Sequence, residues 1–212
     1  MMERPGTQRP IGAPKQLLVE GRTPEIFFRE WVEYLKLDKT IEVRKYGSLD
    51  ELTDFLKVFT RRPDFEEKVK SVGIIRDAED KPAKSAFDSV CESLKAVGLV
   101  FPQGFRSFGD GPIRTGVFIL PDCEQPGMLE TLCWSSLETD PKLRRQLDCV
   151  AAHFQCLREA GVQTQNPHKG RVWTYLAGLG KFDPQVGRAA QYKVWDWNSP
   201  ALGKLATFLQ EL

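Results

Sequence analysis

Long apolar runs are missing from this chain of 212 residues. A transmembrane helix needs roughly 20 consecutive apolar residues, and no segment of the sequence approaches that length. The N-terminal residues carry arginine and proline where a secretory signal peptide would have its apolar region. The sequence therefore predicts neither membrane insertion nor secretion, and we expect a cytoplasmic protein.

Paired cysteines are missing as well. The five cysteines are odd in number and scattered, without the short paired spacing of a zinc site or a disulfide framework. Cys149 and Cys156 flank His153 on a predicted helix, but a closed zinc site needs four ligands. We therefore predict that this stripe packs against the core and that the thiols stay reduced.

A strong net charge is also absent, because 30 lysine and arginine residues face 29 aspartate and glutamate residues. Without a global basic field, binding to nucleic acid or to an anionic membrane depends on a local patch. Glycine-rich phosphate loops are missing too, since the glycines between residues 104 and 111 have neither the P-loop nor the dinucleotide spacing. Most basic side chains are then expected to be solvated. The candidates for phosphate contacts are Arg61, Arg62, Arg106, Arg114, Lys142, Arg144, Arg145, His168, Lys169 and Arg171.

The chain does contain an alternation of apolar segments with helical ones. Apolar runs at residues 15–19, 41–46 and 71–75 each lead into a segment with helical periodicity. Parallel neighbouring strands require a crossover connection, and these helices supply it. The sequence therefore predicts an α/β fold of Rossmann-like type, with helices flanking a central, mostly parallel sheet.

Beyond these three strand–helix units the chain changes character. Segments 105–108 and 115–120 are predicted strands on either side of a glycine-rich turn. Proline then follows a capping residue at Asp140-Pro141, Asn166-Pro167 and Ser199-Pro200, which is typical of helix starts. The last third of the chain is therefore predicted to be mainly helical.

Composition divides the chain into three regions. Residues 1–14 hold prolines and glycines with almost no apolar content, which is typical of a flexible tail. Residues 15–122 are expected to form the α/β core, for which a hydrophobic content of 41% is sufficient. Residues 123–212 are expected to form a helical extension packed on that core.

Acidic residues follow two of the predicted strands. Glu20 ends the first strand, and Asp77 and Glu79 follow the third at a spacing that lets both carboxylates face one side of an extended segment. In open parallel sheets, functional groups gather at the carboxyl ends of the strands. Carboxylate oxygens suit Mg²⁺, which keeps several waters and completes its shell with substrate phosphate. We therefore predict a magnesium site at these acids, although residues 77–80 are also compatible with a solvated turn that caps the next helix, and Glu20 with a surface acid.

The same residues resemble a known group. Val19-Glu20-Gly21 and, after an apolar strand, Asp77-Ala78-Glu79 resemble the TOPRIM fold of topoisomerases, bacterial primases, small ribonucleases and the OLD (overcoming lysogenisation defect) nucleases. With the run from Gly127 to Glu130, the sequence is most similar to a small prokaryotic TOPRIM-like family of unknown function that is related to the OLD nuclease domain.

This resemblance implies a role for each residue at the site. Glu20 would be a metal ligand or general acid/base, while Asp77 and Glu79 would hold Mg²⁺ or Mn²⁺. Glu130 would be a further ligand, and Lys169 would stabilise the charge on phosphate. The activity that the resemblance implies is metal-dependent cleavage of phosphodiester bonds in DNA or RNA.

Two departures from the pattern leave a second hypothesis open. Glu79 replaces the second aspartate of the family's motif, and Pro24 stands where OLD-like nucleases have an acid, so that Glu25 or Asp80 would have to substitute. The alternative is a non-catalytic module that binds metal or nucleotide and acts through a partner such as an ATPase. A receiver-like phosphoacceptor usually has two acids after the first strand, where this chain has only Glu20.

Overall fold

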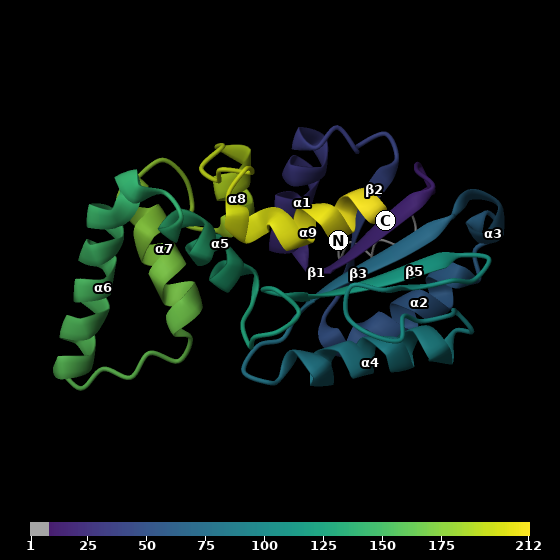
Figure 1. The fold of residues 1–212 in the computed structure, drawn as a ribbon, viewed down its shortest axis with the longest axis horizontal. Coiled ribbons are helices and arrows are strands. Elements are labelled where there is room, and N and C mark those ends of the chain that lie inside the picture. Colours follow the sequence, from purple (N-terminus) through teal and green to yellow (C-terminus); the bar gives the residue numbers. More distant parts are fainter. Residues whose placement is uncertain (1–8) are drawn as a thin grey trace, which may run out of the picture.

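A five-stranded sheet forms the centre of the protein in the computed structural model, which describes residues 9–212 (Figure 1). Four strands run parallel, and β4 pairs with β5 in the antiparallel direction at one edge. The strand order is β2-β1-β3-β5-β4, so β1 and β3 lie inside the sheet. The strands are β1 Lys15–Glu20, β2 Ile41–Gly47, β3 Ser71–Asp77, β4 Phe108–Gly109 and β5 Arg114–Leu120.

Helices cover both faces of the sheet, which confirms the predicted α/β fold. α1 and α9 lie over one face, and α2 and α4 lie over the other (Figure 1). Because each helix buries an apolar stripe against the strands, the sheet is shielded from water on both sides. The helices of this part are α1 Arg22–Tyr34, α2 Leu52–Thr60, the short α3 Phe65–Lys68, α4 Ala83–Ala96 and α9 Gly203–Glu211.

The central strand β3 has the composition of a strand covered on both faces. Val72, Ile74 and Ile75 are all buried, so its side chains form a continuous apolar run rather than an alternating one. A Cβ atom at Gly73 would lie 2.8 Å from Cδ2 of Leu212, the residue after α9. The absence of a side chain at Gly73 therefore lets the end of α9 approach the middle of the sheet.

The C-terminal region is helical, as predicted. α6 and α7 lie side by side at one end of the molecule, and α5 joins them to the sheet (Figure 1). Short 3₁₀ turns begin at Pro141 and Pro200, and α7 begins at Pro167, so all three predicted starts are confirmed. No helix within residues 9–212 is both long and apolar enough to cross a membrane. The helices are α5 Leu129–Glu138, α6 Arg144–Glu159, α7 Pro167–Leu179 and α8 Val186–Gln191.

Two local predictions are wrong. Only Phe108 and Gly109 form β4, because Arg106 takes a left-handed conformation (φ 62°) that interrupts the strand predicted at 105–108. Cys149 and Cys156 are exposed rather than packed in the core. Their helix α6 instead buries a stripe of Leu147, Val150 and Phe154, which lies on a different side from the cysteines.

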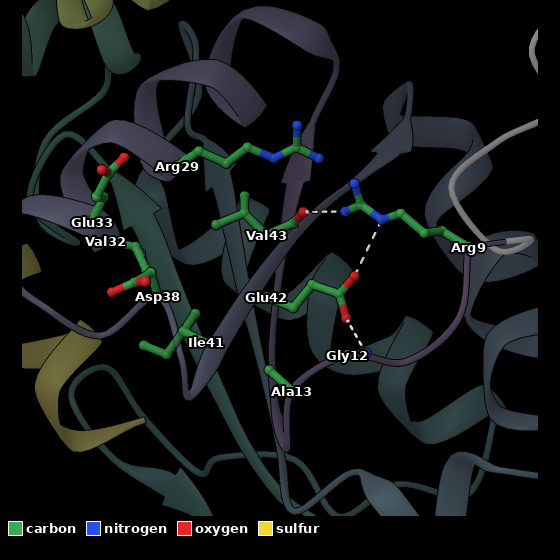
Figure 2. Close-up of a pocket in the computed structure, with 10 residues that line it drawn as sticks. All are labelled: Arg9, Gly12, Ala13, Arg29, Val32, Glu33, Asp38, Ile41, Glu42 and Val43. Carbon is green, nitrogen blue, oxygen red and sulfur yellow. Dashed lines mark hydrogen bonds and ion pairs between the residues drawn. The ribbon is translucent and has the colours of Figure 1, made fainter.

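The segment before β1 also differs from the prediction of a flexible tail through residue 14. Residues 1–8 lie outside the described part of the chain, but residues 9–14 run along β2, and Ile11 and Ala13 are buried. Arg9 donates hydrogen bonds to the carboxylate of Glu42 (3.2 Å) and to the carbonyl of Val43 (3.1 Å), as Figure 2 shows. The prediction of a tail rested on the content of proline, glycine and apolar residues, which does not reveal these polar contacts.

Candidate acidic site at the carboxyl ends of the strands

A pocket of about 320 Å³ opens at the carboxyl ends of β1 and β3. The structure brings together in its wall all five side chains to which the sequence analysis assigns a role: Glu20, Asp77, Glu79, Glu130 and Lys169. The remaining lining residues are Thr23, Pro24, Leu129, Trp173, Gln185 and Val186. The wall of the pocket is therefore formed by residues at the ends of the strands together with residues of the helices.

Glu20 reaches the pocket because β1 turns directly into α1. It is the last residue of β1, and the next residue, Gly21, has a φ of 76°, a left-handed value that favours glycine. The parallel pairing of β1 with β3 then sets Glu20 near the end of β3. Glu20, Asp77 and Glu79 accordingly line the same pocket.

Asp77 is fixed by the start of α5. It ends β3, and its Oδ1 atom accepts a hydrogen bond from the backbone N–H of Leu129 at 2.9 Å. Two residues on, Glu79 and Gly127 exchange backbone hydrogen bonds of 2.8 and 2.7 Å. Glu79 has a φ of 56°, which is uncommon outside glycine. These contacts join the loop before α5 to the end of β3 and thereby place Glu130, in the first turn of α5, at the pocket.

Two of the acids in the pocket, Asp77 and Glu130, have raised pKa values. Burial raises the pKa of Asp77 to about 7, and the nearby charges of Glu130 and Glu20 add to this, against the opposing effect of the Leu129 N–H and Lys169. Burial also raises the pKa of Glu130, while its own backbone N–H and the charges of Lys169 and His168 oppose the rise. A bound cation would relieve this repulsion.

The donor set fits a hard divalent cation. All four acids offer carboxylate oxygens, the ligand type that Mg²⁺ prefers, and burial raises the pKa of two of them, Asp77 and Glu130. Within residues 9–212, however, no three histidine, cysteine or acidic side chains already stand in the arrangement of a metal cluster. An ion held here would therefore depend on rotation of the acidic side chains and on water or substrate oxygens for the rest of its shell.

The expected substitutes for the missing acid at Pro24 are not in the pocket. Pro24 itself lines the wall, whereas Glu25 is buried and forms ion pairs with Arg22 (2.9 Å) and Arg29. Asp80 is absent from the lining residues too. The fourth acid of the pocket is instead Glu130.

Lys169 is the single phosphate-contact candidate that lines the pocket. The side chain of Asn166 caps α7 by accepting a hydrogen bond from the backbone N–H of Lys169 at 3.0 Å, which fixes this residue in the first turn. Four other candidates are engaged elsewhere. Arg62 pairs with Asp64, Arg106 with Glu124 and Arg144 with Asp148, and Arg114 lies over the Phe108 ring.

Two residues near the acids escaped the sequence analysis. Tyr46 of β2 is fully buried, and its hydroxyl has no hydrogen-bond partner within the described residues. Burial raises its pKa, and the charges of Glu20 and Asp77 raise it further, so the phenol lies close to the site. Trp173 also lines the pocket. The one sequence feature that could have suggested it is its position in α7, about one helical turn after Lys169.

Comparison with known proteins identifies the family of this chain but not an activity. Residues 14–212 match the model of a family described as "Protein of unknown function (DUF3226)". Neither the curated proteins nor the solved structures include a match to this chain. The matched residues take in the whole sheet and every acid of the pocket. The chain belongs to the DUF3226 family.

Proposed function

We propose that this protein is a magnesium-dependent nuclease of TOPRIM type, which cleaves phosphodiester bonds of DNA or RNA in the acidic pocket. The observation behind the proposal is the pocket itself, which gathers four carboxylates and Lys169 and in which burial raises the pKa of Asp77 and Glu130. A cation and a phosphate group together would balance these charges, since the cation neutralises the acids and the lysine pairs with the phosphate.

The residues have distinct roles in this reaction. Glu20, Asp77 and Glu79 would hold Mg²⁺, which when bound polarises phosphoryl oxygens and makes water more acidic. Glu20 takes the proton of the attacking water, whose oxygen bonds to phosphorus while the bond from phosphorus to the leaving oxygen breaks. The leaving oxygen takes a proton from solvent. Lys169 stabilises the negative charge that builds on the phosphate oxygens.

Cleavage assays test the proposal. Purified protein is incubated with plasmid and with single-stranded oligonucleotides in Mg²⁺, in Mn²⁺ and in chelator. We expect cleavage that requires the metal and that falls at least ~100-fold in Asp77→Ala, because the variant loses the acid that the Leu129 N–H holds at the end of β3. Cleavage that is unchanged in Asp77→Ala would show that the pocket is not the active site.

One observation favours a second candidate, a non-catalytic module that binds a metal and acts through a protein partner. Pro24 stands in the wall where the related nucleases have an acid, and neither Glu25 nor Asp80 replaces it. The same assay separates the two when it is combined with thermal unfolding. A melting temperature that rises with millimolar Mg²⁺, without cleavage of any substrate, would support the module.

A further inference from the structure

Trp173 is exposed, unlike the other tryptophans. Of the five in the chain, Trp31, Trp134 and Trp195 are buried, and Trp197 stacks on Trp31 with ring centroids 5.4 Å apart. Trp173 is 46% exposed, and within residues 9–212 no aromatic ring packs against it. An indole of this size gains much from burial, so its exposed surface offers binding energy to a flat ligand that covers it.

The exposed ring lies at the acidic pocket. Trp173 and Lys169 both line it, and they are four residues apart on α7, so they occupy neighbouring positions on one face of this helix. Glu20, Asp77 and Glu79 supply acids from the sheet to the same pocket. The pocket thus combines an aromatic ring, an ammonium group and a cluster of carboxylates.

α7 holds this ring in place. Asn166 caps its start, and Val172 and Leu176, which neighbour Lys169 and Trp173 on the helix, are fully buried, so the helix is anchored at its end and along the side next to the ring. A side chain on an anchored helix loses little freedom when a flat ligand stacks on it. Trp173 is therefore suited to act as a rigid platform.

We propose that Trp173 stacks on an unpaired nucleobase next to the phosphate bound at Lys169 and the acids, so that the protein selects single-stranded nucleic acid. This inference rests on the proposed function and names its substrate class. Stacking on an aromatic side chain needs an accessible base face, which an unpaired base offers and a base inside a duplex does not. A pocket of about 320 Å³ is at the lower end of small-molecule sites, a size that suits one nucleotide rather than a duplex.

Binding measurements test the inference separately from cleavage. Fluorescence anisotropy follows a labelled single-stranded oligonucleotide and a duplex of the same sequence, with Ca²⁺ in place of Mg²⁺ to slow cleavage. We expect Trp173→Ala to weaken single-strand binding about 10- to 100-fold and to change duplex binding by less than about twofold. Trp173→Phe keeps a stacking ring and should stay close to wild type. Tyr192→Ala, which removes an aromatic ring that is 56% exposed but lies outside the pocket, should have no effect.

The outcomes distinguish this inference from the proposed function. Wild-type protein that cleaves nucleic acid, with single-strand binding unchanged in Trp173→Ala, would overturn the inference alone. The expected binding pattern without any cleavage would support the inference and overturn the catalytic proposal. Protein that neither binds nor cleaves nucleic acid would overturn both.

Discussion

Asp77→Asn is expected to stabilise the folded protein by about 2 to 4 kcal/mol at slightly alkaline pH, although it removes an acid of the site. The cause is the burial of the Asp77 carboxylate, to which the charges of Glu130 and Glu20 add, and together they raise its pKa from 3.8 to about 7. A neutral amide has no charge to desolvate, and its oxygen can still accept the hydrogen bond from the Leu129 N–H. An acid kept where it destabilises the fold is typical of a functional site.

The effect of this substitution should depend on pH in a defined way. Below about pH 4 the carboxyl group is protonated in both the folded and the unfolded chain, so wild type and variant should be equally stable. As pH rises toward about 7, the unfolded chain loses this proton first, and the wild type loses stability that the variant keeps. Above about pH 7 the difference should be constant.

Urea unfolding of both proteins across this pH range, without divalent metal, measures the difference. A variant that is less stable than wild type at alkaline pH would mean that the neighbours of Asp77 stabilise its charged form, which contradicts the raised pKa of this group. In Mg²⁺ the advantage of the variant should shrink, because a cation that binds the folded wild type stabilises it.

Arg44→Met is expected to destabilise the protein by about 3 to 5 kcal/mol, since it breaks a buried ion pair by removing one partner. Arg44 is 1% exposed, and its Nη2 atom lies 2.8 Å from a carboxylate oxygen of Glu42. It also donates hydrogen bonds to the side chain of Gln16 (2.7 Å) and to the carbonyls of Arg9 (2.9 Å) and Pro10 (2.6 Å). Its removal takes this partner from Glu42 and removes two hydrogen bonds to the segment before β1, which keeps the contacts of Arg9 and Gly12 with β2.

A surface ion pair provides the matched control. Lys57 pairs with Asp54 at 2.9 Å, but both side chains are exposed, so Lys57→Met should change the free energy of unfolding by less than about 1 kcal/mol. Equilibrium unfolding in urea compares the two variants. Similar losses in Arg44→Met and Lys57→Met would show that the contacts of residues 9–14 with β2 do not contribute to stability.

The sheet could be predicted from sequence because its strands are marked locally. β1 and β3 are compact apolar runs, and each is followed by a helix that begins near a glycine or proline. Residues 9–14 were misassigned because their order comes from distant partners such as Arg44, which local composition does not reveal. The exposure of Cys149 was missed because the packing of α6 against α7 decides which of its faces is buried.

Some residues of the candidate site could also be predicted from the sequence, and others could not. Glu20 and Asp77 meet because strand order alone brings the ends of β1 and β3 together. Glu130 depends on the backbone pairing between Glu79 and Gly127, and the family resemblance suggested it where spacing could not. Trp173 reaches the pocket only through the placement of α7, so no pattern in the sequence pointed to it.

Crystals soaked with Mn²⁺, whose anomalous scattering identifies the ion, test the central claim that the pocket binds a divalent cation. We predict a peak in the pocket about 2.0 to 2.2 Å from a carboxylate oxygen of Asp77 and from at least one of Glu20 and Glu79. The peak should be absent from crystals of Asp77→Asn soaked in the same way. Wild-type crystals in millimolar Mn²⁺ with no peak in the pocket, or an equal peak in the variant, would contradict the claim.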